Sequence, residues 1–230
     1  MEEKRHINIQ YDKELREVKD SLIYAGALTE KAIEQGINAL LNRDTELARQ
    51  VIANDIVIDR LDTEIEEKCI RLLALRQPAA RDLRFITTAI KINGHLERIG
   101  DMAANIAEKA IILNQEPLLK PYVDLPRMAE IAQGMIKESL DAFVNEDVAL
   151  AHKVRKDDEI IDNLNEQIFR MELLTFMMEN PQTIHRALII SQISKLLERV
   201  SDHAEGIADM VIYMVTGKSV RHKPASAENG

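Results

Sequence analysis

The second half of this 230-residue chain repeats the first half, and this duplication limits the folds open to it. At an offset of 103 residues, ten positions of the first half meet identical residues, from Ala39 with Ala142 to Pro78 with Pro181. Beyond the proline the offset becomes 101, and seven more positions from residue 96 to residue 107 match identical residues. The chain therefore contains two copies of one structural unit.

Each unit has the pattern of three helices. In the first unit, apolar residues recur at a spacing of three to four over residues 11–42, 46–76 and 81–113, as on amphipathic helices. Only 8 glycines and 6 prolines occur in the chain, and aromatic residues make up 3%, which disfavours sheets with their frequent turns and aromatic faces. The short turn at 42–45 favours antiparallel neighbours.

We therefore predict an all-α fold of two tandem, sequence-related three-helix bundles with six long antiparallel helices. The predicted divisions are an N-terminal tail at 1–10, a first repeat at 11–113, a linker at 114–124, a second repeat at 125–217 and a tail at 218–230.

Composition and net charge disfavour several classes of function. The single cysteine, Cys69, cannot form an internal disulfide, and the formal net charge of −9 disfavours binding to nucleic acid or anionic lipid. The N-terminus lacks an apolar signal segment, and no apolar stretch approaches the roughly 18 residues that cross a bilayer. We expect a cytoplasmic protein without direct membrane insertion.

Four pairs of acidic residues, each spaced i and i+4, recur at matched positions of the two units. This spacing places both carboxylates of a pair on one helix face. The pairs are Asp55 with Asp59, Glu97 with Asp101, Asp158 with Asp162, and Glu198 with Asp202. If the second and third helices of a unit are adjacent, four carboxylates come together, and such oxygen donors bind hard cations such as Mg²⁺, Mn²⁺, Ca²⁺ or iron.

An ordinary solvated face is the alternative interpretation. With 39 acids in 230 residues, chance alone supplies roughly seven pairs at this spacing, and acids opposite an apolar stripe are usual on a helix. Only the recurrence in both units raises metal binding above this background.

Other patterns predict less. Gly217-Lys218-Ser219 resembles the end of a phosphate-binding loop but fits a helix C-cap at Gly217 better. Cys69 has no activating neighbours in the sequence, and His95 and His203 fit ordinary packing or surface roles. Three glycines inside the third helices of the units suggest close helix approach; they are Gly94, Gly100 and Gly206.

Two segments carry a resemblance to a known family. Leu-Glu-Arg-Ile-Gly-Asp at 96–101, followed by Asn-Ile-Ala-Glu at 105–108, resembles the signature of the PhoU family of bacterial phosphate-uptake regulators. Pro-Ala-Ala-Arg-Asp-Leu-Arg at 78–84 is similar to a second segment of that family. The resemblance covers residues 7–218 and implies two three-helix bundles, usually assembled as homodimers.

The resemblance also implies metal ions, divalent or trivalent (Mg, Mn, Zn or Fe), held by the acid pairs and not used in catalysis. The implied ligands are Asp55, Asp59, Glu97, Asp101, Asp158, Asp162, Glu198 and Asp202. The second unit departs from the pattern around its acids: it has Ser201 for the signature glycine, Asn165 where Asp62 stands, and Phe169 where Glu66 stands. It also lacks the Asp-Leu-Arg segment.

For function, the resemblance implies negative regulation of phosphate uptake and starvation signalling by a non-enzymatic adaptor. The implied partners are the ATPase subunit of the phosphate ABC transporter and a membrane sensor histidine kinase. Two alternatives stay open: a metal-dependent phosphohydrolase, for which no general acid or base is identified beside the carboxylates, and a helical interaction module that binds no metal.

Overall fold

The computed structural model describes residues 2–220 and, among these, the side chains of residues 9–170 and 173–220. The described residues contain helices and loops but no β-strand. The first repeat consists of α1 (Glu2–Leu41), α2 (Thr45–Arg76) and α3 (Ala80–Asn114). The second consists of α4 (Asp124–Asn145), α5 (Val148–Gln167) and α7 (Ile184–Thr216). Between α5 and α7 lie a π-helical segment (Ile168–Leu173), the short α6 (Leu174–Glu179) and a 3₁₀ turn (Pro181–Thr183).

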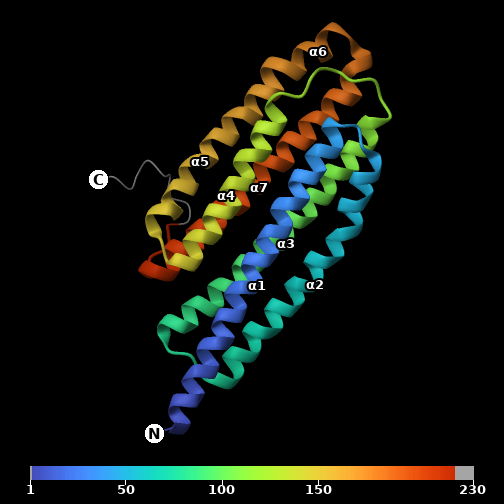
Figure 1. Cartoon of the computed structure of the whole chain (residues 1–230). Helices are drawn as coiled ribbons and strands as arrows, with labels where there is room; N and C mark the ends of the chain where they lie inside the picture. Colours follow the sequence, from blue (N-terminus) through green and yellow to red (C-terminus); the bar gives the residue numbers. More distant parts are fainter. Residues whose placement is uncertain (1, 221–230) are drawn as a thin grey trace, which may run out of the picture.

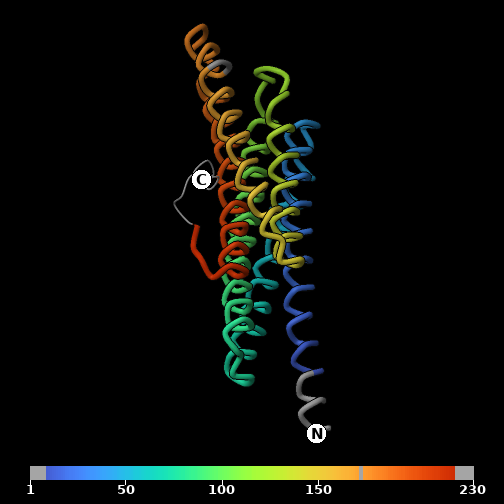
Figure 2. The backbone as a smooth tube through the Cα atoms, turned by 90° about the vertical axis from the view of Figure 1, so that its left-hand side faces the viewer, coloured from blue at the N-terminus to red at the C-terminus, as the bar shows by residue number. Residues whose placement is uncertain are grey.

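The two repeats form two antiparallel three-helix bundles that lie side by side (Figure 1). Helices α3 and α7 pack against each other between the bundles, and α1 packs against α4. The view from the side shows the same long, narrow arrangement (Figure 2). The predicted fold class is confirmed, and the unpredicted detail is the break of the second repeat's middle helix into α5, the π-helical segment and α6.

The duplicated sequence produces the same loop twice. Asp44 accepts a hydrogen bond from Leu47 N at 2.9 Å, and Asp147 accepts one from Leu150 N at 3.0 Å, so each caps the N-terminus of its helix. The residue directly before each capping aspartate, Arg43 or Glu146, has a left-handed backbone conformation with φ 55°. The repeat therefore encodes matching turns between the first and second helices of each bundle.

The two termini of the chain agree with the prediction only in part. Helix α1 begins at Glu2, so residues 2–10, expected as a tail, are helical; the first glycine or proline of the chain is Gly26, and nothing earlier interrupts a helix. At the other end Gly217 is the left-handed C-cap of α7 at φ 71°, as expected. The predicted tail at 218–230 lies largely outside the described residues, which end at 220.

One apolar core extends through both bundles. Leu22 and Ile99 of the first repeat and Phe143 and Ile193 of the second are fully buried in the same cluster. Gly26 allows α1 to approach α4, because a Cβ there would lie 2.0 Å from Leu140 Cδ1. The two repeats are therefore packed as one body. No described helix is both long enough and apolar enough to cross a membrane.

Candidate metal sites and the junction between the repeats

The first acidic cluster consists of Asp55 and Asp59 on α2 and Glu97 and Asp101 on α3. These helices pack against each other, and Gly100 lets them approach, since a Cβ at that position would lie 3.1 Å from Asp55 Oδ1. Asp59 is exposed and the other three acids are partly buried. The four predicted residues of the first repeat are thus brought to one face of the bundle.

The carboxylates of the first acidic cluster influence one another. Burial, followed by the charges of Asp59 and Asp101, raises the pKa of Asp55 to about 6. Burial and then Asp101 raise the pKa of Glu97. Arg98 offsets part of this repulsion, with Nη1 3.1 Å from Asp101 Oδ2 and Nε 3.3 Å from Glu97 Oε2.

The second acidic cluster has the same plan: Asp158 and Asp162 on α5, and Glu198 and Asp202 on α7. Burial raises the pKa of Asp158 to about 6, and the nearby Ser201 hydroxyl offsets part of this rise. That hydroxyl donates its hydrogen bond to Glu198 O at 2.7 Å. Burial and Glu198 also raise the pKa values of Asp162 and Asp202.

Two basic side chains, Lys195 and Arg155, distinguish the second acidic cluster from the first, and neither was predicted from the sequence. Lys195 forms an ion pair with Glu198. Arg155, whose side chain is 2% exposed, has Nε 3.0 Å from Asp209 Oδ1 and 3.6 Å from Glu205 Oε1. Their counterparts in the first repeat are Gly94 and Ile52, so a comparison of charge between the repeats would have revealed them.

Asn165 and Ser194 of the second repeat, which stand where the first repeat has Asp62 and Asn93, keep the polar contact between these two positions. In the first repeat, Asn93 donates to Asp62 Oδ1 at 2.6 Å. At the equivalent place Ser194 donates to Asn165 Oδ1 at 2.6 Å. The contact between the second and third helices survives while its charge is lost.

The residues fit a hard cation by the chemistry of their donors. All eight predicted ligands offer carboxylate oxygens, and Asp158 Oδ1 is buried without a hydrogen-bond partner among the described residues. In the part of the chain with described side chains, no group of three or more His, Cys, Asp or Glu is arranged to hold a metal ion. Metal binding would therefore require these side chains to turn toward the ion, and the metal sites stay a prediction.

Two histidines meet where the repeats pack together. His95 Nδ1 on α3 and His203 Nδ1 on α7 lie 2.9 Å apart, with the rings edge to face. Gly206 makes room for this contact, because a Cβ there would lie 2.5 Å from His95 Cε1. Close approach is thus confirmed for Gly100 and Gly206, but it is wrong for Gly94, where a Cβ would meet nothing within 4 Å.

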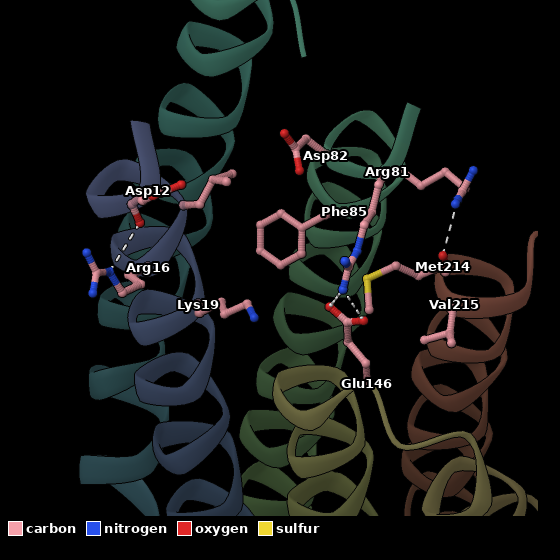
Figure 3. Close-up of a pocket in the computed structure, with 11 residues that line it drawn as sticks. Asp12, Arg16, Lys19, Arg81, Asp82, Phe85, Glu146, Met214 and Val215 are labelled. Atoms are coloured by element: carbon pink, nitrogen blue, oxygen red, sulfur yellow. Dashed lines mark hydrogen bonds and ion pairs between the residues drawn. The ribbon is translucent and has the colours of Figure 1, made fainter. Parts of the chain in front are cut away.

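The segment at 78–84 ties the first repeat to the second (Figure 3). Arg81 Nη2 donates to both carboxylate oxygens of Glu146, at 2.7 and 2.9 Å, and Arg84 Nε donates to Met214 O at 3.2 Å. These contacts border a cavity of about 590 Å³ between α1, α3, the α4–α5 loop and α7. A structural role in joining the repeats therefore accounts for both arginines.

Cys69 has no reactive environment. Its side chain is fully buried in the first bundle, and burial raises the pKa of the thiol to about 11. The thiol is protonated at neutral pH and is a packing residue.

The fold and the paired acidic clusters define a class of duplicated helical-bundle proteins, and comparison with known proteins identifies it. The PhoU domain matches the chain twice, at residues 22–110 and 125–211. The chain belongs to the PhoU family.

The sequence similarity to curated relatives extends over nearly the whole length of this chain. A phosphate-specific transport system accessory protein PhoU homolog of Aquifex aeolicus is 44% identical over 211 residues, covering 92% of this chain and 95% of the relative. The homolog of the same name from Pseudomonas aeruginosa is 42% identical over 218 residues, covering 94% and 90%.

Solved structures show the same fold. The crystal structure of PhoU from Pseudomonas aeruginosa superposes with a TM-score of 0.86 at 41% identity, covering 90% of this chain and all of that one. The phosphate transport system regulatory protein PhoU from Streptococcus pneumoniae gives a TM-score of 0.84 at 30% identity, covering 91% and 99%.

Proposed function

We propose that this protein is a negative regulator of phosphate uptake and of the response to phosphate starvation. In this proposal it is a cytoplasmic, homodimeric, cation-binding adaptor between the ATPase subunit of a phosphate ABC transporter and a membrane sensor histidine kinase. The relatives are named accessory proteins of the phosphate-specific transport system, and a solved relative is named a regulatory protein. These names describe accessory proteins and not enzymes.

The observation that supports the metal-dependent part most is the duplication of the acidic clusters. Each repeat keeps four carboxylates on its second and third helices, although partial burial and then their mutual repulsion raise the pKa values of Asp55 and Asp158 to about 6. Core packing does not need these charges. Cation binding is a function that accounts for four acids at matched positions in both repeats.

The residues would hold the cation with their carboxylate oxygens: Asp55, Asp59, Glu97 and Asp101 in the first repeat, and Asp158, Asp162, Glu198 and Asp202 in the second. A bound cation would supply positive charge and no chemistry of bond breaking. The side chains themselves would turn toward the ion and lose their mutual repulsion. The face of each bundle would then present less negative charge to a partner.

Expression of phosphate-starvation genes in phosphate-rich medium tests the regulatory role. A strain lacking this protein should express these genes constitutively, and the parent protein should restore repression. Asp59→Asn/Asp101→Asn should fail to restore it, whereas the control Glu17→Gln/Asp20→Asn, which removes two charges from α1, should succeed. Normal repression in the strain lacking the protein would contradict the proposed function.

A further inference from the structure

A hollow of about 360 Å³ lies between α1, α2 and α3 of the first repeat. Its walls are partly aliphatic, with Leu28, Val51 and Ile58. Gly100 and Ala104 of α3 also line the hollow, and neither has a side chain larger than a methyl group. Sites for small organic molecules commonly enclose roughly 300–1,000 Å³ and combine apolar walls with a few polar groups. This hollow is therefore large enough for one small organic molecule.

Three carboxamides border the hollow. Gln35 lies on α1, and Gln50 and Asn54 lie on α2. None of these carboxamides is hydrogen-bonded to another residue in the part of the chain with described side chains. Each offers one acceptor oxygen and an NH₂ group with two donors. All three can therefore bind a ligand without breaking a contact within the protein.

The equivalent three positions of the second repeat carry charged side chains that are joined to one another. These side chains are Glu138, Lys153 and Asp157. Lys153 Nζ lies 2.6 Å from Glu138 Oε2 on α4 and 2.8 Å from Asp157 Oδ2 on α5. The ion pairs tie α4 to α5 at the place where the first repeat has its three carboxamides.

The third helices of the two repeats differ in the same sense. Where α3 has Gly100 and Ala104, α7 has Ser201 and Glu205. The carboxylate of Glu205 lies 3.6 Å from the buried guanidinium of Arg155. The second repeat thus uses these positions for internal contacts, whereas in the first repeat they border space. The hollow is therefore a property of the first repeat's side chains and not of the helix packing that both repeats share.

One charge of each sign completes the lining. Lys31 on α1 has no ion-pair partner among the described side chains, and Asp55 on α2 lies against Gly100. A lysine ammonium group is a common partner of phosphate, and an acidic side chain accepts hydrogen bonds from ribose hydroxyls. The carboxamides of Asn and Gln match the N6 and N7 edge of adenine. These groups together match the three parts of an adenine nucleotide.

We propose that this hollow binds an adenine nucleotide of the size of AMP. The aliphatic walls contact the base, the carboxamides pair with its N6 and N7 edge, Asp55 accepts from the ribose, and Lys31 pairs with the phosphate. Because the volume of about 360 Å³ is near the lower end for ligand sites, it suits a single nucleotide. The inference goes beyond the proposed function, and it gives the first repeat a ligand that the second repeat has no space to hold.

Titration of the full-length protein with AMP, in a chelating buffer that removes metal ions, tests this proposal by calorimetry. The parent should bind AMP saturably. Gln35→Glu/Gln50→Lys/Asn54→Asp installs the ion-paired side chains of the second repeat, so it should fold and should weaken AMP binding about tenfold or more. Absence of saturable AMP binding to the parent, or unchanged affinity in this variant, would overturn the proposal.

A matched control makes the reverse exchange in the second repeat. Glu138→Gln/Lys153→Gln/Asp157→Asn removes the ion pairs between α4 and α5 and should bind AMP as the parent does. Thermal unfolding of both triple variants shows that they are folded at the temperature of the titration. An equal loss of AMP binding in the two variants would contradict a site in the first repeat.

Two further comparisons separate the phosphate from the base. Lys31 is exposed, so Lys31→Gln should fold normally; it should weaken AMP binding about tenfold and leave adenosine binding unchanged. GMP, which has an oxygen in place of the N6 amino group, should bind the parent about tenfold more weakly than AMP. Equal effects of Lys31→Gln on AMP and adenosine would contradict the phosphate contact, and equal affinities for GMP and AMP would overturn the assignment of adenine.

Discussion

Gly100 on α3 lies directly against the Asp55 carboxylate on α2. A Cβ on residue 100 would stand 3.1 Å from Asp55 Oδ1 and 3.0 Å from Ile58 Cδ1, closer than side chains normally pack. At the equivalent place in the second repeat, Ser201 interacts with Asp158. The residue at this position therefore sets how closely the third helix of each repeat approaches the partly buried aspartate, Asp55 or Asp158, on the second helix.

Alanine substitutions at two glycines of α3 should have opposite effects. Gly94→Ala should raise the free energy of unfolding by about 0.5–1 kcal/mol, because alanine favours the helix and a Cβ there meets nothing. Gly100→Ala should lower it by about 1 kcal/mol, because the steric cost exceeds the same gain. Urea denaturation measures both, and stabilisation by Gly100→Ala would show that α2 and α3 are not packed this closely.

The histidine contact between the repeats predicts a compensating pair of variants. Gly206→Ala should destabilise the protein by about 1–2 kcal/mol, since a Cβ would collide with the ring of His95. His95→Ala in the same chain should relieve that collision. A double-mutant cycle in urea should therefore show clear non-additivity, and strictly additive effects would mean that the two residues do not touch.

The raised pKa values of Asp55 and Asp158 predict a pH dependence of stability in metal-free buffer. Each aspartate titrates near 6 in the folded protein and near 3.9 when unfolded, so the folded state holds more protons between these values. The contribution of the two groups to stability is then greatest at low pH and declines as pH rises from about 4 to 6.

Replacement by asparagine isolates this contribution. In a chelating buffer at pH 7, Asp55→Asn/Asp158→Asn should melt above the parent by about 2–4 °C, the range for roughly 1 kcal/mol in a chain of this size. At pH 4.5 the difference should shrink. A difference that grew toward low pH would contradict the raised pKa values.

The two matched caps should contribute equally. Asp44→Ala and Asp147→Ala each remove the side-chain acceptor of one helix N-terminus and should each cost about 1 kcal/mol of stability. Asp44→Ser and Asp147→Ser keep an acceptor and serve as controls, with losses of a few tenths. Thermal unfolding compares all four, and an alanine variant as stable as the parent would exclude a role for that cap.

Much of this fold could be predicted from the sequence because its signals are local. The duplicated Asp44 and Asp147 fix two caps, and Gly217 fixes the end of α7. The path between α5 and α7 could not be predicted, since the π-helical segment at Ile168–Leu173 has no signature of spacing or turn residues. Long helices leave their exact ends open as well, as the start of α1 at Glu2 shows.

The candidate sites could be predicted in part for a similar reason. The spacing of i and i+4 places acids on one face of one helix, and the repeat shows which pairs are matched. Which groups face them from the neighbouring helix depends on tertiary packing. The sequence shows that Arg155 replaces Ile52, but only the structure shows that its guanidinium is buried between α5 and α7 beside Glu205 and Asp209.

The most direct test of the central claim is binding of the transporter ATPase to this protein with and without cations. We predict that Mn²⁺ or Mg²⁺ supports capture of the ATPase by the parent and that a chelator abolishes this capture. Asp59→Asn/Asp101→Asn should capture little ATPase whether the cation or the chelator is present. Capture of equal strength by the parent and the variant, unaffected by the chelator, would contradict a cation-dependent adaptor and would leave a regulator that docks through protein contacts alone.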